Sequence, residues 1–253
     1  MTSLSGQTAL ITGGASGVGR AMAEAFDKAG ATVWVVDASR EALDTCPDHW
    51  GRACFDVADE ARVKRLFEKH LPDGVDILCA NAGTAGPTAP VTDISLEDWR
   101  ACTAVNLDAV FLFAKHAAPA MVAKGAGSII ITSSTAGLHG YPNRAPYCAS
   151  KWAVIGLAKT LAMELGPDGV RANAICPGSV NGPRMDGVIE REAAAKGTTP
   201  DDIRAGYTKG VSLRTFVDAE DIANMAVFLA SDAGKRISGQ ALSVDGHIFN
   251  PDA

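Results

Sequence analysis

The sequence predicts an α/β fold made of a single doubly wound domain, in which a seven-stranded, mostly parallel sheet carries helices on both faces. Three observations favour this class. Short apolar runs rich in β-formers alternate with helical stretches along the whole chain, which is typical of βαβ units. The first run leads directly into a glycine-rich turn and a helix. No internal repeat, linker or low-complexity tract divides the 253 residues, so we expect residues 1–253 to form one domain.

Composition excludes several classes of partner. Apolar residues make up 47% of the chain, charged residues make up 21%, and the formal net charge is −6. Because this mildly acidic chain has no basic cluster, we expect neither nucleic acid nor a membrane as partner. No apolar run approaches the ~18 residues of a membrane span. The first residues show no secretory signal pattern, so the expected compartment is the cytoplasm.

Cysteines and histidines give no indication of a metal site. The six cysteines form no CxxC pair and most lie in apolar contexts, which predicts buried, reduced thiols. Cys148 directly follows Tyr147 in the sequence, so its side chain should point to a different side of the helix. The five histidines show neither HxxxH nor HExxH spacing.

The first strand and helix have the layout of a dinucleotide site. Thr8–Thr12 reads as a buried strand, and a helix follows over Arg20–Ala29. The glycine-rich turn between them would let the backbone approach a pyrophosphate, and the helix N-terminus would offer free N–H groups and a positive dipole end. The cofactor contacts predicted in this turn are Gly13, Ser16, Gly17, Val18 and Gly19.

The second strand, Ala31–Val36, ends at Asp37. A carboxylate at this place accepts hydrogen bonds from ribose hydroxyls and repels a 2′-phosphate. The glycine turn contains no Lys or Arg that would hold such a phosphate, and Arg40 is the one nearby cation that would argue otherwise. We therefore predict NAD rather than NADP.

The middle of the chain continues the alternation. The strand Gly51–Phe55 precedes a helix over Glu60–His70, which Asp56 or Asp59 would cap. The strand Val75–Ala80 is followed by a loop at 84–94 and by a helix beginning at Ser95 or Asp93. A second helix then continues through Asn106 and Phe111 to about Ala123.

The stretch from Ser133 to Lys151 carries the candidate chemistry. The strand Gly127–Thr132 would deliver Ser134 to its carboxyl end, and a helix over Tyr147–Leu165 would place Lys151 one turn after Tyr147 on the same face. A free tyrosine has a pKa near ~10 and is a poor base, but a nearby cation favours the phenolate. Such a phenol can exchange a proton with an alcohol or a ketone, and Ser134 could position the substrate oxygen.

The C-terminal part predicts a mobile cover over the site. Val170–Cys176 is the sixth strand, Asp218–Ser231 a helix and Leu242–Val244 the seventh strand. Between them, residues 181–212 are long, polar and partly helix-prone, which is typical of a substrate lid. Its candidate pocket walls are Met185, Val188, Ile189, Tyr207 and Leu213. Further side chains in the 135–146 loop that could touch substrate are His139, Tyr141 and Arg144.

Together these motifs resemble the short-chain dehydrogenase/reductase family, from Thr8 to Gly246. The chain matches its TGxxxGxG turn, its NAG motif at 81–83, its YxxxK pair and its closing signature at 240–246. The resemblance implies a Rossmann fold and a bound NAD. It implies the catalytic residues Asn106, Ser134, Tyr147 and Lys151, with Asn106 binding a water that links Lys151 to solvent. The further cofactor contacts it implies are Asp56, Val57, Asn81, Ala82, Gly83, Tyr147, Lys151, Pro177, Gly178 and Val180.

The resemblance also shows where this sequence differs from the family pattern and which oligomer to expect. Gly182 stands where the family has a threonine that binds the cofactor, and Ser179 or Asn181 are candidate replacements. His247 stands where glycine is frequent, either at the surface or reaching a pocket. The helix Tyr147–Leu165 is apolar nearly all round, and in the family it contributes to a four-helix contact between subunits. A homotetramer or homodimer is expected.

The function that follows is NAD-dependent interconversion of a secondary alcohol and its ketone, with a sugar, polyol or cyclic alcohol as substrate. A 3-oxoacyl thioester reductase using NADPH shares the motifs, but Asp37 argues against that cofactor. A dehalogenase-type lyase would lack the glycine turn and tend to replace Lys151 by Arg. A non-catalytic NAD-binding scaffold would have lost one of the four catalytic residues.

Overall fold

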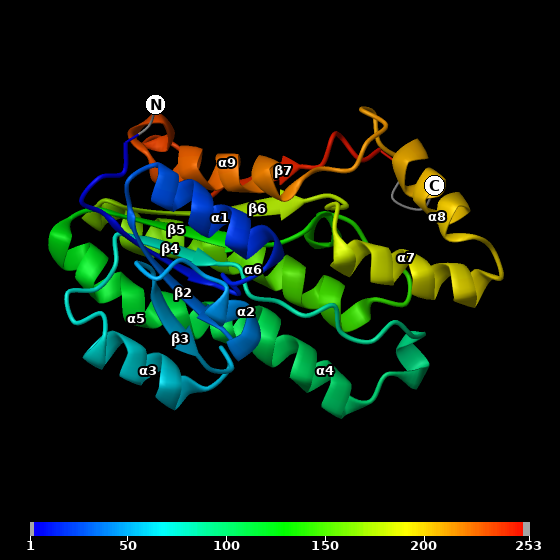
Figure 1. The fold of residues 1–253 in the computed structure, drawn as a ribbon, viewed down its shortest axis with the longest axis horizontal. Helices are drawn as coiled ribbons and strands as arrows, with labels where there is room; N and C mark the ends of the chain where they lie inside the picture. Colours follow the sequence, from blue (N-terminus) through cyan, green and yellow to red (C-terminus); the bar gives the residue numbers. More distant parts are fainter. Residues whose placement is uncertain (1–2, 250–253) are drawn as a thin grey trace.

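A computed structural model describes residues 3–249 and shows one sheet of seven strands with helices on both faces (Figure 1). The strand order is β3-β2-β1-β4-β5-β6-β7, and every neighbouring pair is parallel. This confirms the predicted doubly wound Rossmann class, with a sheet that is parallel throughout its described strands. The chain order reverses between β1 and β4, and that is where a crevice opens in such sheets.

The strands fall within two residues of the predicted bounds, because each is a short apolar run between turn-forming residues. They are β1 Thr8–Thr12, β2 Thr32–Asp37, β3 Gly51–Cys54, β4 Ile77–Ala80, β5 Gly127–Thr132, β6 Val170–Pro177 and β7 Ala241–Val244.

The helices differ more from prediction. The short helix α2 was not predicted; Ser39 caps it, its Oγ accepting from the Ala42 N–H at 3.1 Å. Helix α1 starts at Gly17 instead of Arg20, so the end of the glycine turn belongs to its first turn. The helices are α1 Gly17–Lys28, α2 Arg40–Asp44, α3 Glu60–Lys69, α4 Leu96–Thr103, α5 Ala109–Lys124, α6 Ala145–Leu165, α7 Pro183–Lys196, α8 Pro200–Lys209 and α9 Ala219–Ala230.

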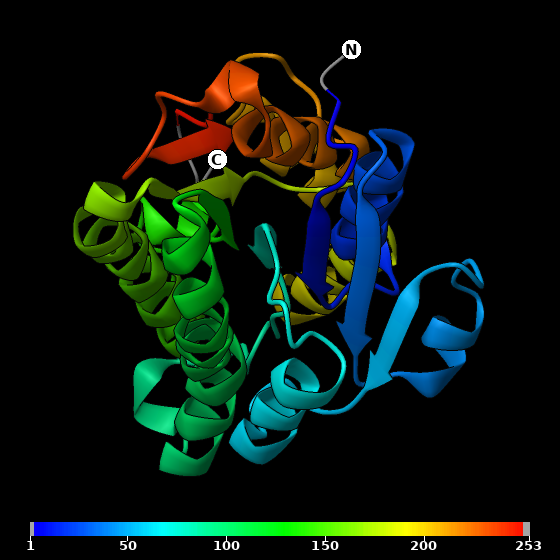
Figure 2. The ribbon, with the colours of Figure 1, turned by 90° about the vertical axis from the view of Figure 1, so that its left-hand side faces the viewer.

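Two apolar layers hold the helices to the sheet. Alternate sheet residues such as Ile11 and Ile130 pack on one face against α1 and α9, and residues such as Leu10 and Ile129 pack on the other against α3, α5 and α6. Figure 2 shows the two helical layers on either side of the strands. None of the described helices is long and apolar enough to cross a bilayer.

Helix α1 lies directly against α9, although most of the chain separates them in sequence (Figure 1). Met22 and Phe26 of α1 are fully buried in the same apolar layer as Ile222 and Leu229 of α9. The first helix, which begins at the glycine turn, is therefore held from behind by the last.

Helices α7 and α8 extend beyond the carboxyl ends of the strands (Figure 1). They pack on each other through a small apolar cluster of Ile189, Ala193, Ile203 and Phe216. A capping box of Thr199 and Asp202 begins α8. Most of the region predicted as a lid is thus two helices with a core of their own.

Candidate active site

A cavity of about 730 Å³ lies at the carboxyl ends of the strands. It runs from Asp37 and Asp56, which follow β2 and β3, to Tyr147 and Lys151 on α6. Every residue predicted to contact the cofactor lines it: Gly13, Ser16, Gly17, Val18, Gly19, Asp37, Asp56, Val57, Asn81, Ala82, Gly83, Tyr147, Lys151, Pro177, Gly178 and Val180.

The glycine turn forms a cradle at the start of α1. Gly13 and Gly17 have φ angles of 61° and 52°, which favour glycine. A Cβ at Gly19 would lie 2.0 Å from the Gly13 carbonyl oxygen, so the turn closes only without a side chain there. The first-turn N–H groups of α1 have no helical partners, and Ser16 provides no side-chain cap. Bare N–H groups at a helix N-terminus fit the pyrophosphate of a dinucleotide.

The Asp37 carboxylate is fixed at the rim of the cavity. Its Oδ2 accepts from the Ala15 N–H at 3.2 Å and its Oδ1 from the Ser39 N–H at 3.0 Å. Arg40 begins α2, is exposed and does not line the cavity. At β3, the residue that caps α3 is Asp59, whose Oδ1 accepts from the Arg62 N–H at 3.0 Å. This leaves Asp56 as a wall of the cavity.

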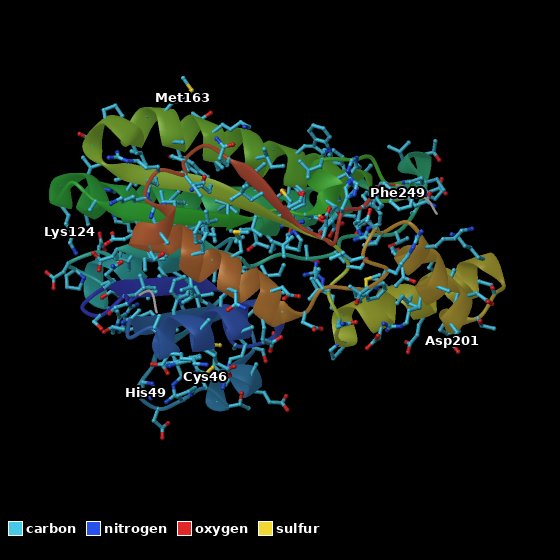
Figure 3. All side chains as sticks on the ribbon, turned by 90° about the horizontal axis from the view of Figure 1, so that it is seen from above. Cys46, His49, Lys124, Met163, Asp201 and Phe249 are labelled. Carbon is cyan, nitrogen blue, oxygen red and sulfur yellow. The ribbon has the colours of Figure 1, made fainter. Side chains whose placement is uncertain are left out.

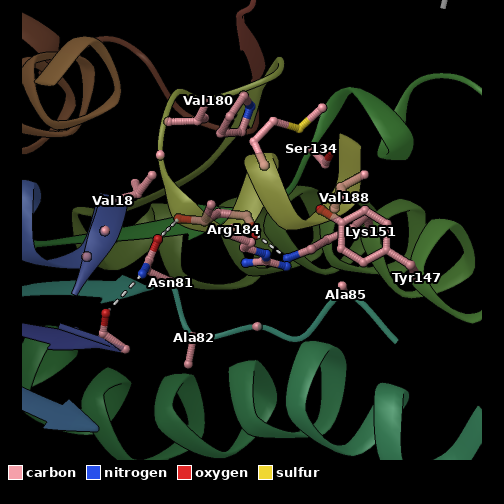
Figure 4. Close-up of a pocket in the computed structure, with 18 of the residues that line it drawn as sticks. Val18, Asn81, Ala82, Ala85, Ser134, Tyr147, Lys151, Val180, Arg184 and Val188 are labelled. Atoms are coloured by element: carbon pink, nitrogen blue, oxygen red, sulfur yellow. Dashed lines mark hydrogen bonds between the residues drawn. The ribbon is translucent and has the colours of Figure 1, made fainter. Parts of the chain in front are cut away.

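Asn81 ties three strand ends together beneath the cavity (Figure 4). Its Nδ2 donates to the Thr12 carbonyl oxygen at 3.2 Å, and its Oδ1 accepts from Thr132 Oγ1 at 3.1 Å. The Thr12 hydroxyl in turn accepts from the N–H groups of Asn81 and Ala82, at 2.9 and 3.0 Å. Asn81 thus tethers the loop after β4 to the ends of β1 and β5.

Lys151 is 4% exposed, and its Nζ donates to the Thr132 carbonyl oxygen at 2.8 Å. Burial and, to a smaller extent, the positive charge of Arg184 together lower the pKa of Lys151 from 10.5 to about 8. The ammonium lies 5.8 Å from the centre of the Tyr147 ring. The site therefore holds a buried cation beside a phenol.

Ser134 and Tyr147 complete this group on one side of the pocket (Figure 4). Ser134 follows β5, and its Oγ accepts from the Ala136 N–H at 3.1 Å. Tyr147 is half-buried near the start of α6, with the Arg144 guanidinium 4.8 Å from its ring centre. A hydroxyl, a phenol and an ammonium that face one cavity can bind an alcohol oxygen and exchange its proton.

Asn106 lies behind this group and does not line the cavity. It is fully buried in a π turn, Ala104–Asp108, between α4 and α5. Its Oδ1 accepts from the Thr84 N–H at 2.8 Å, and its Nδ2 lies 3.0 Å from the Thr84 carbonyl oxygen and 3.2 Å from Ser150 Oγ. The side chain thus holds the loop after β4 against α6. Its predicted water-binding role stays a prediction.

The loop after β6 explains the departure at Gly182. This residue has φ 136° and ψ 175°, a conformation that is essentially restricted to glycine, so a threonine would be strained there. Asn181 is engaged elsewhere, because its Nδ2 donates to Asp218 Oδ1 at 2.7 Å. The Ser179 hydroxyl lines the cavity and makes no side-chain hydrogen bond to the described residues. Ser179 is thus the better placed of the two candidate replacements.

Predictions for the substrate wall were mixed. Met185, Val188 and Tyr207 line the cavity, as do Tyr141 and Arg144. The prediction was wrong for Ile189, which is buried between α7 and α8, and for Leu213, which is 71% exposed; neither lines the cavity.

His139, also predicted, is exposed and does not line the cavity. Cys148 points away from it, with Sγ 3.9 Å from the Tyr141 carbonyl oxygen. His247 lies apart from it, with its Nδ1 2.7 Å from Ser212 Oγ. Among the described residues, no three His, Cys, Asp or Glu side chains converge as a metal site would require.

Arg184 is a charged lining residue that the sequence analysis missed. It lies in the first turn of α7 and lines the cavity, and its side chain extends toward Lys151 (Figure 4). The sequence did contain a signal for its position. Pro183 is typical of the first position of a helix, which would place Arg184 in the first turn, directly after the Gly182 loop.

Comparisons with known proteins identify relatives along nearly the whole chain. A family model described as enoyl-(acyl carrier protein) reductase matches residues 13–247. A 3-oxoacyl-[acyl-carrier-protein] reductase of Thermotoga maritima is 34% identical over 254 residues, covering 97% of this chain and 98% of the relative.

Two solved structures share the fold closely. The structure of an NAD⁺-bound xylitol dehydrogenase matches with a TM-score of 0.90 and 28% identity, over 96% of this chain and 99% of the other. A structure described as an NAD(P)-dependent gluconate 5-dehydrogenase of Beutenbergia cavernae, with NADP bound at low occupancy, matches with a TM-score of 0.84 and 36% identity, over 96% and 97%.

Proposed function

The chain belongs to the short-chain dehydrogenase/reductase family of oxidoreductases, and from this membership we propose that it interconverts a secondary alcohol and its ketone with NAD as cofactor. The observation that carries the proposal is Lys151, a buried ammonium beside Tyr147 at the end of a cavity that begins at the glycine cradle. A scaffold protein would have no need to bury a cation that has no counter-ion among the described residues, because such burial costs stability.

The chemistry is divided among three side chains. Ser134 holds the substrate oxygen in place beside Tyr147. Tyr147 removes the hydroxyl proton when the alcohol is oxidised and returns it when the ketone is reduced. The charge of Lys151, fixed by its bond to the Thr132 carbonyl oxygen, favours the phenolate form of Tyr147. The oxidised cofactor, held at the glycine turn and at Asp37, would supply the hydride acceptor for the oxidation, and its reduced form would supply the hydride for the reverse reaction.

We propose that the proton taken from the substrate leaves for solvent along the buried side of α6. Asn106 Oδ1 and Lys151 Nζ both approach Gly83, at 3.1 and 3.5 Å from the position of an added Cβ. A water held near them would connect Lys151 to solvent, as the family resemblance implies. Asn106 also fixes the loop that closes this side.

NAD is proposed over NADP because of Asp37. Its fixed carboxylate would accept ribose hydroxyls and repel a 2′-phosphate, and Arg40 lies outside the cavity. The xylitol relative binds NAD⁺ and the gluconate relative binds NADP, so similarity alone supports either cofactor.

A 3-oxoacyl thioester reductase is the second candidate, favoured by the Thermotoga maritima relative and the description of the family model. Asp37 argues against the NADPH that this activity usually requires. Rates with NADH and NADPH on an acyl thioester, compared with rates on alcohols, separate the two candidates.

Three further features are proposed with the function. Residues 181–212 would close over substrate as a lid, since α7 and α8 form a separate small core. The exposed apolar side chains of α5 and α6 would join subunits in a homodimer or homotetramer. The expected compartment is the cytoplasm, in keeping with the unpaired thiols of the cysteines.

The first prediction tests the acid/base role of Tyr147. In a panel of secondary alcohols, sugars and polyols assayed for NADH formation, Tyr147→Phe should lower turnover by about 10²- to 10⁴-fold, because phenylalanine has no oxygen to accept the proton of the alcohol. NAD affinity, measured by calorimetry, should stay unchanged.

The matched control is Tyr207→Phe, which removes a hydroxyl from another wall of the same cavity and should lower turnover by less than about tenfold. Near-normal turnover by Tyr147→Phe would refute the role assigned to this phenol.

A further inference from the structure

We propose that the substrate carries a carboxylate in addition to its reacting alcohol, and that Arg144 and Arg184 bind this carboxylate. The inference rests on the proposed function and deepens it by naming a substrate class. It is carried by the charges at the catalytic end of the cavity and by the incomplete hydrogen bonding of the two arginines.

The charges that line the cavity are unevenly divided. Its carboxylates, Asp37 and Asp56, follow β2 and β3. Around Tyr147 the charged lining residues are Arg144, Lys151 and Arg184, and all of them are cations. A cavity end that gathers positive charge with no lining carboxylate favours an anionic ligand.

Neighbouring carboxylates do not supply the missing charge. Asp186 is paired with Arg204, and Glu192 is paired with Lys196 at 2.7 Å. Glu192 also accepts from the Tyr207 hydroxyl at 2.8 Å. Neither carboxylate lines the cavity, so the cations at its end have no protein counter-ion among the described residues.

Arg144 presents an incompletely bonded guanidinium beside the catalytic phenol. Its Nη2 donates to the Ala85 carbonyl oxygen at 3.2 Å, and its Nε is buried with no hydrogen-bond partner in the described structure. A buried donor left unpaired is costly unless a ligand completes it. The guanidinium lies 4.8 Å from the Tyr147 ring centre, so a group bound to Arg144 would lie close to the reacting oxygen.

Arg184 reaches the same cavity from the first turn of α7. It makes no hydrogen bond or ion pair with the residues that the structure describes. Its positive charge contributes to the lowered pKa of Lys151. Figure 4 shows its side chain directed into the pocket toward Lys151. Arg184 and Lys151 carry like charges that repel each other. An anion bound beside them would reduce this repulsion.

A carboxylate fits these residues better than a larger anion. The planar guanidinium group binds a carboxylate through two parallel N–H bonds. The same cavity of about 730 Å³ must also hold the dinucleotide, which leaves room for a small substrate. The competing occupant of Arg184 is a cofactor phosphate, and the test below separates the two.

The test uses the full chain loaded with NADH and two ligands of similar shape, cyclohexanecarboxylate and cyclohexanecarboxamide. Binding measured by calorimetry needs no turnover. The wild type should bind the acid at least about tenfold more tightly than the amide, since a charge-assisted pair outweighs a neutral one. Arg144→Gln and Arg184→Gln should each remove most of this preference, and Arg184→Lys should keep part of it.

The matched control is Arg191→Gln, a change on the same helix as Arg184 but outside the cavity, which should leave the preference intact. NADH affinity should be equal in all variants. In turnover assays with 4-hydroxycyclohexanecarboxylate and its methyl ester, the two arginine changes should raise the ratio of KM for the acid to KM for the ester about tenfold.

The proposal is overturned if the wild type does not bind the acid, or binds acid and amide equally. It is also overturned if Arg184→Gln weakens NADH binding while the preference for acid persists, because Arg184 would then belong to the cofactor. Failure of the proposed function has a different signature. In that case no alcohol yields NADH, whatever the ligand preference.

Discussion

Lys151 shows what one residue can contribute to this site and what it costs. Its ammonium has a backbone carbonyl as hydrogen-bond partner and no carboxylate among the described residues. Burial, with the charge of Arg184, brings its pKa to about 8, so it still carries a proton at neutral pH. A cation kept in this state destabilises the folded chain, and we propose that it is retained for its effect on Tyr147.

The pH dependence of stability should reveal this cost. The folded pKa of about 8 lies below the ordinary value of 10.5, so the unfolded chain binds more protons between these values and wild-type stability rises with pH there. Below pH 8 the full cost applies. Relative to Lys151→Met, the wild-type free energy of unfolding should rise by about 2–3 kcal/mol from about pH 7 to about pH 10 in urea titrations.

The control for that experiment is Lys159→Met, an exposed lysine on the same helix, whose difference from wild type should change little over the same pH range. A constant difference between wild type and Lys151→Met would mean that Lys151 is not a buried cation.

Single residues were predictable where their neighbours in space are also neighbours in sequence. Tyr147 and Lys151 lie one helical turn apart, so their approach follows from spacing alone. Ile189 and Arg184 both lie on α7, and which of them faces the cavity depends on how α7 packs against α8. The sequence alone carries no measure of that packing, so Ile189 was misassigned and Arg184 was missed.

At the scale of elements, the turn between β6 and α7 illustrates a backbone requirement. Gly182→Ala should lower the free energy of unfolding by about 1–3 kcal/mol, because its φ of 136° is closed to residues with a Cβ. Gly187→Ala, five residues later inside α7, should instead raise it by about 0.5–1 kcal/mol. Chemical denaturation of both variants measures the contrast, and effects of the same sign would contradict this account of the turn.

The outer face of α6 exposes large apolar side chains. Trp152 is 53% exposed, Met163 is 80% exposed and Phe111 on α5 is 50% exposed. Figure 3 shows Met163 projecting from α6 away from the sheet. Large apolar side chains gathered on neighbouring helices are typical of subunit contacts.

Trp152→Glu should therefore shift the protein to a smaller assembly in sedimentation velocity, because a carboxylate would be buried without a partner in the contact. Phe228→Glu, which changes an exposed aromatic on α9 across the sheet, is the control and should not. A wild type that sediments as a monomer would refute the assembly.

Element bounds were predictable to the extent that local signals define them. Strands came out nearly unchanged, because apolar runs bounded by turn residues are local. Helix α2 was missed because five residues are too few to show a periodicity, and only its Ser39 cap signals it. The π turn at Asn106 was also missed, since the sequence read as continuous helix.

For the whole molecule, the βα alternation and the right-handed crossover rule leave few possible sheet orders, and the predicted class was therefore secure. The order also places Asp37, the cradle and Lys151 along one edge. What could not be predicted is the position of α7 and α8 over that edge, because their small core determines it.

Cofactor binding should stabilise the molecule as a unit. At about 100 times its Kd, NAD adds about 2.7 kcal/mol, which should raise Tm by about 5–10 °C. NADP should raise it less, and Asp37→Ala should reduce the difference between the two cofactors in thermal melts, because it removes the repelling carboxylate. An equal shift with both cofactors in the wild type would contradict the assignment of NAD.

The packing of α1 on α9 has a consequence for synthesis of the protein. The ribosome delivers the nucleotide cradle long before the helix that supports it, because α9 follows α1 much later in the chain. A nascent chain would thus carry all the glycines of the cradle and still lack affinity for the dinucleotide. Removal of α9 would therefore abolish dinucleotide binding, although α9 supplies none of the predicted nucleotide contacts.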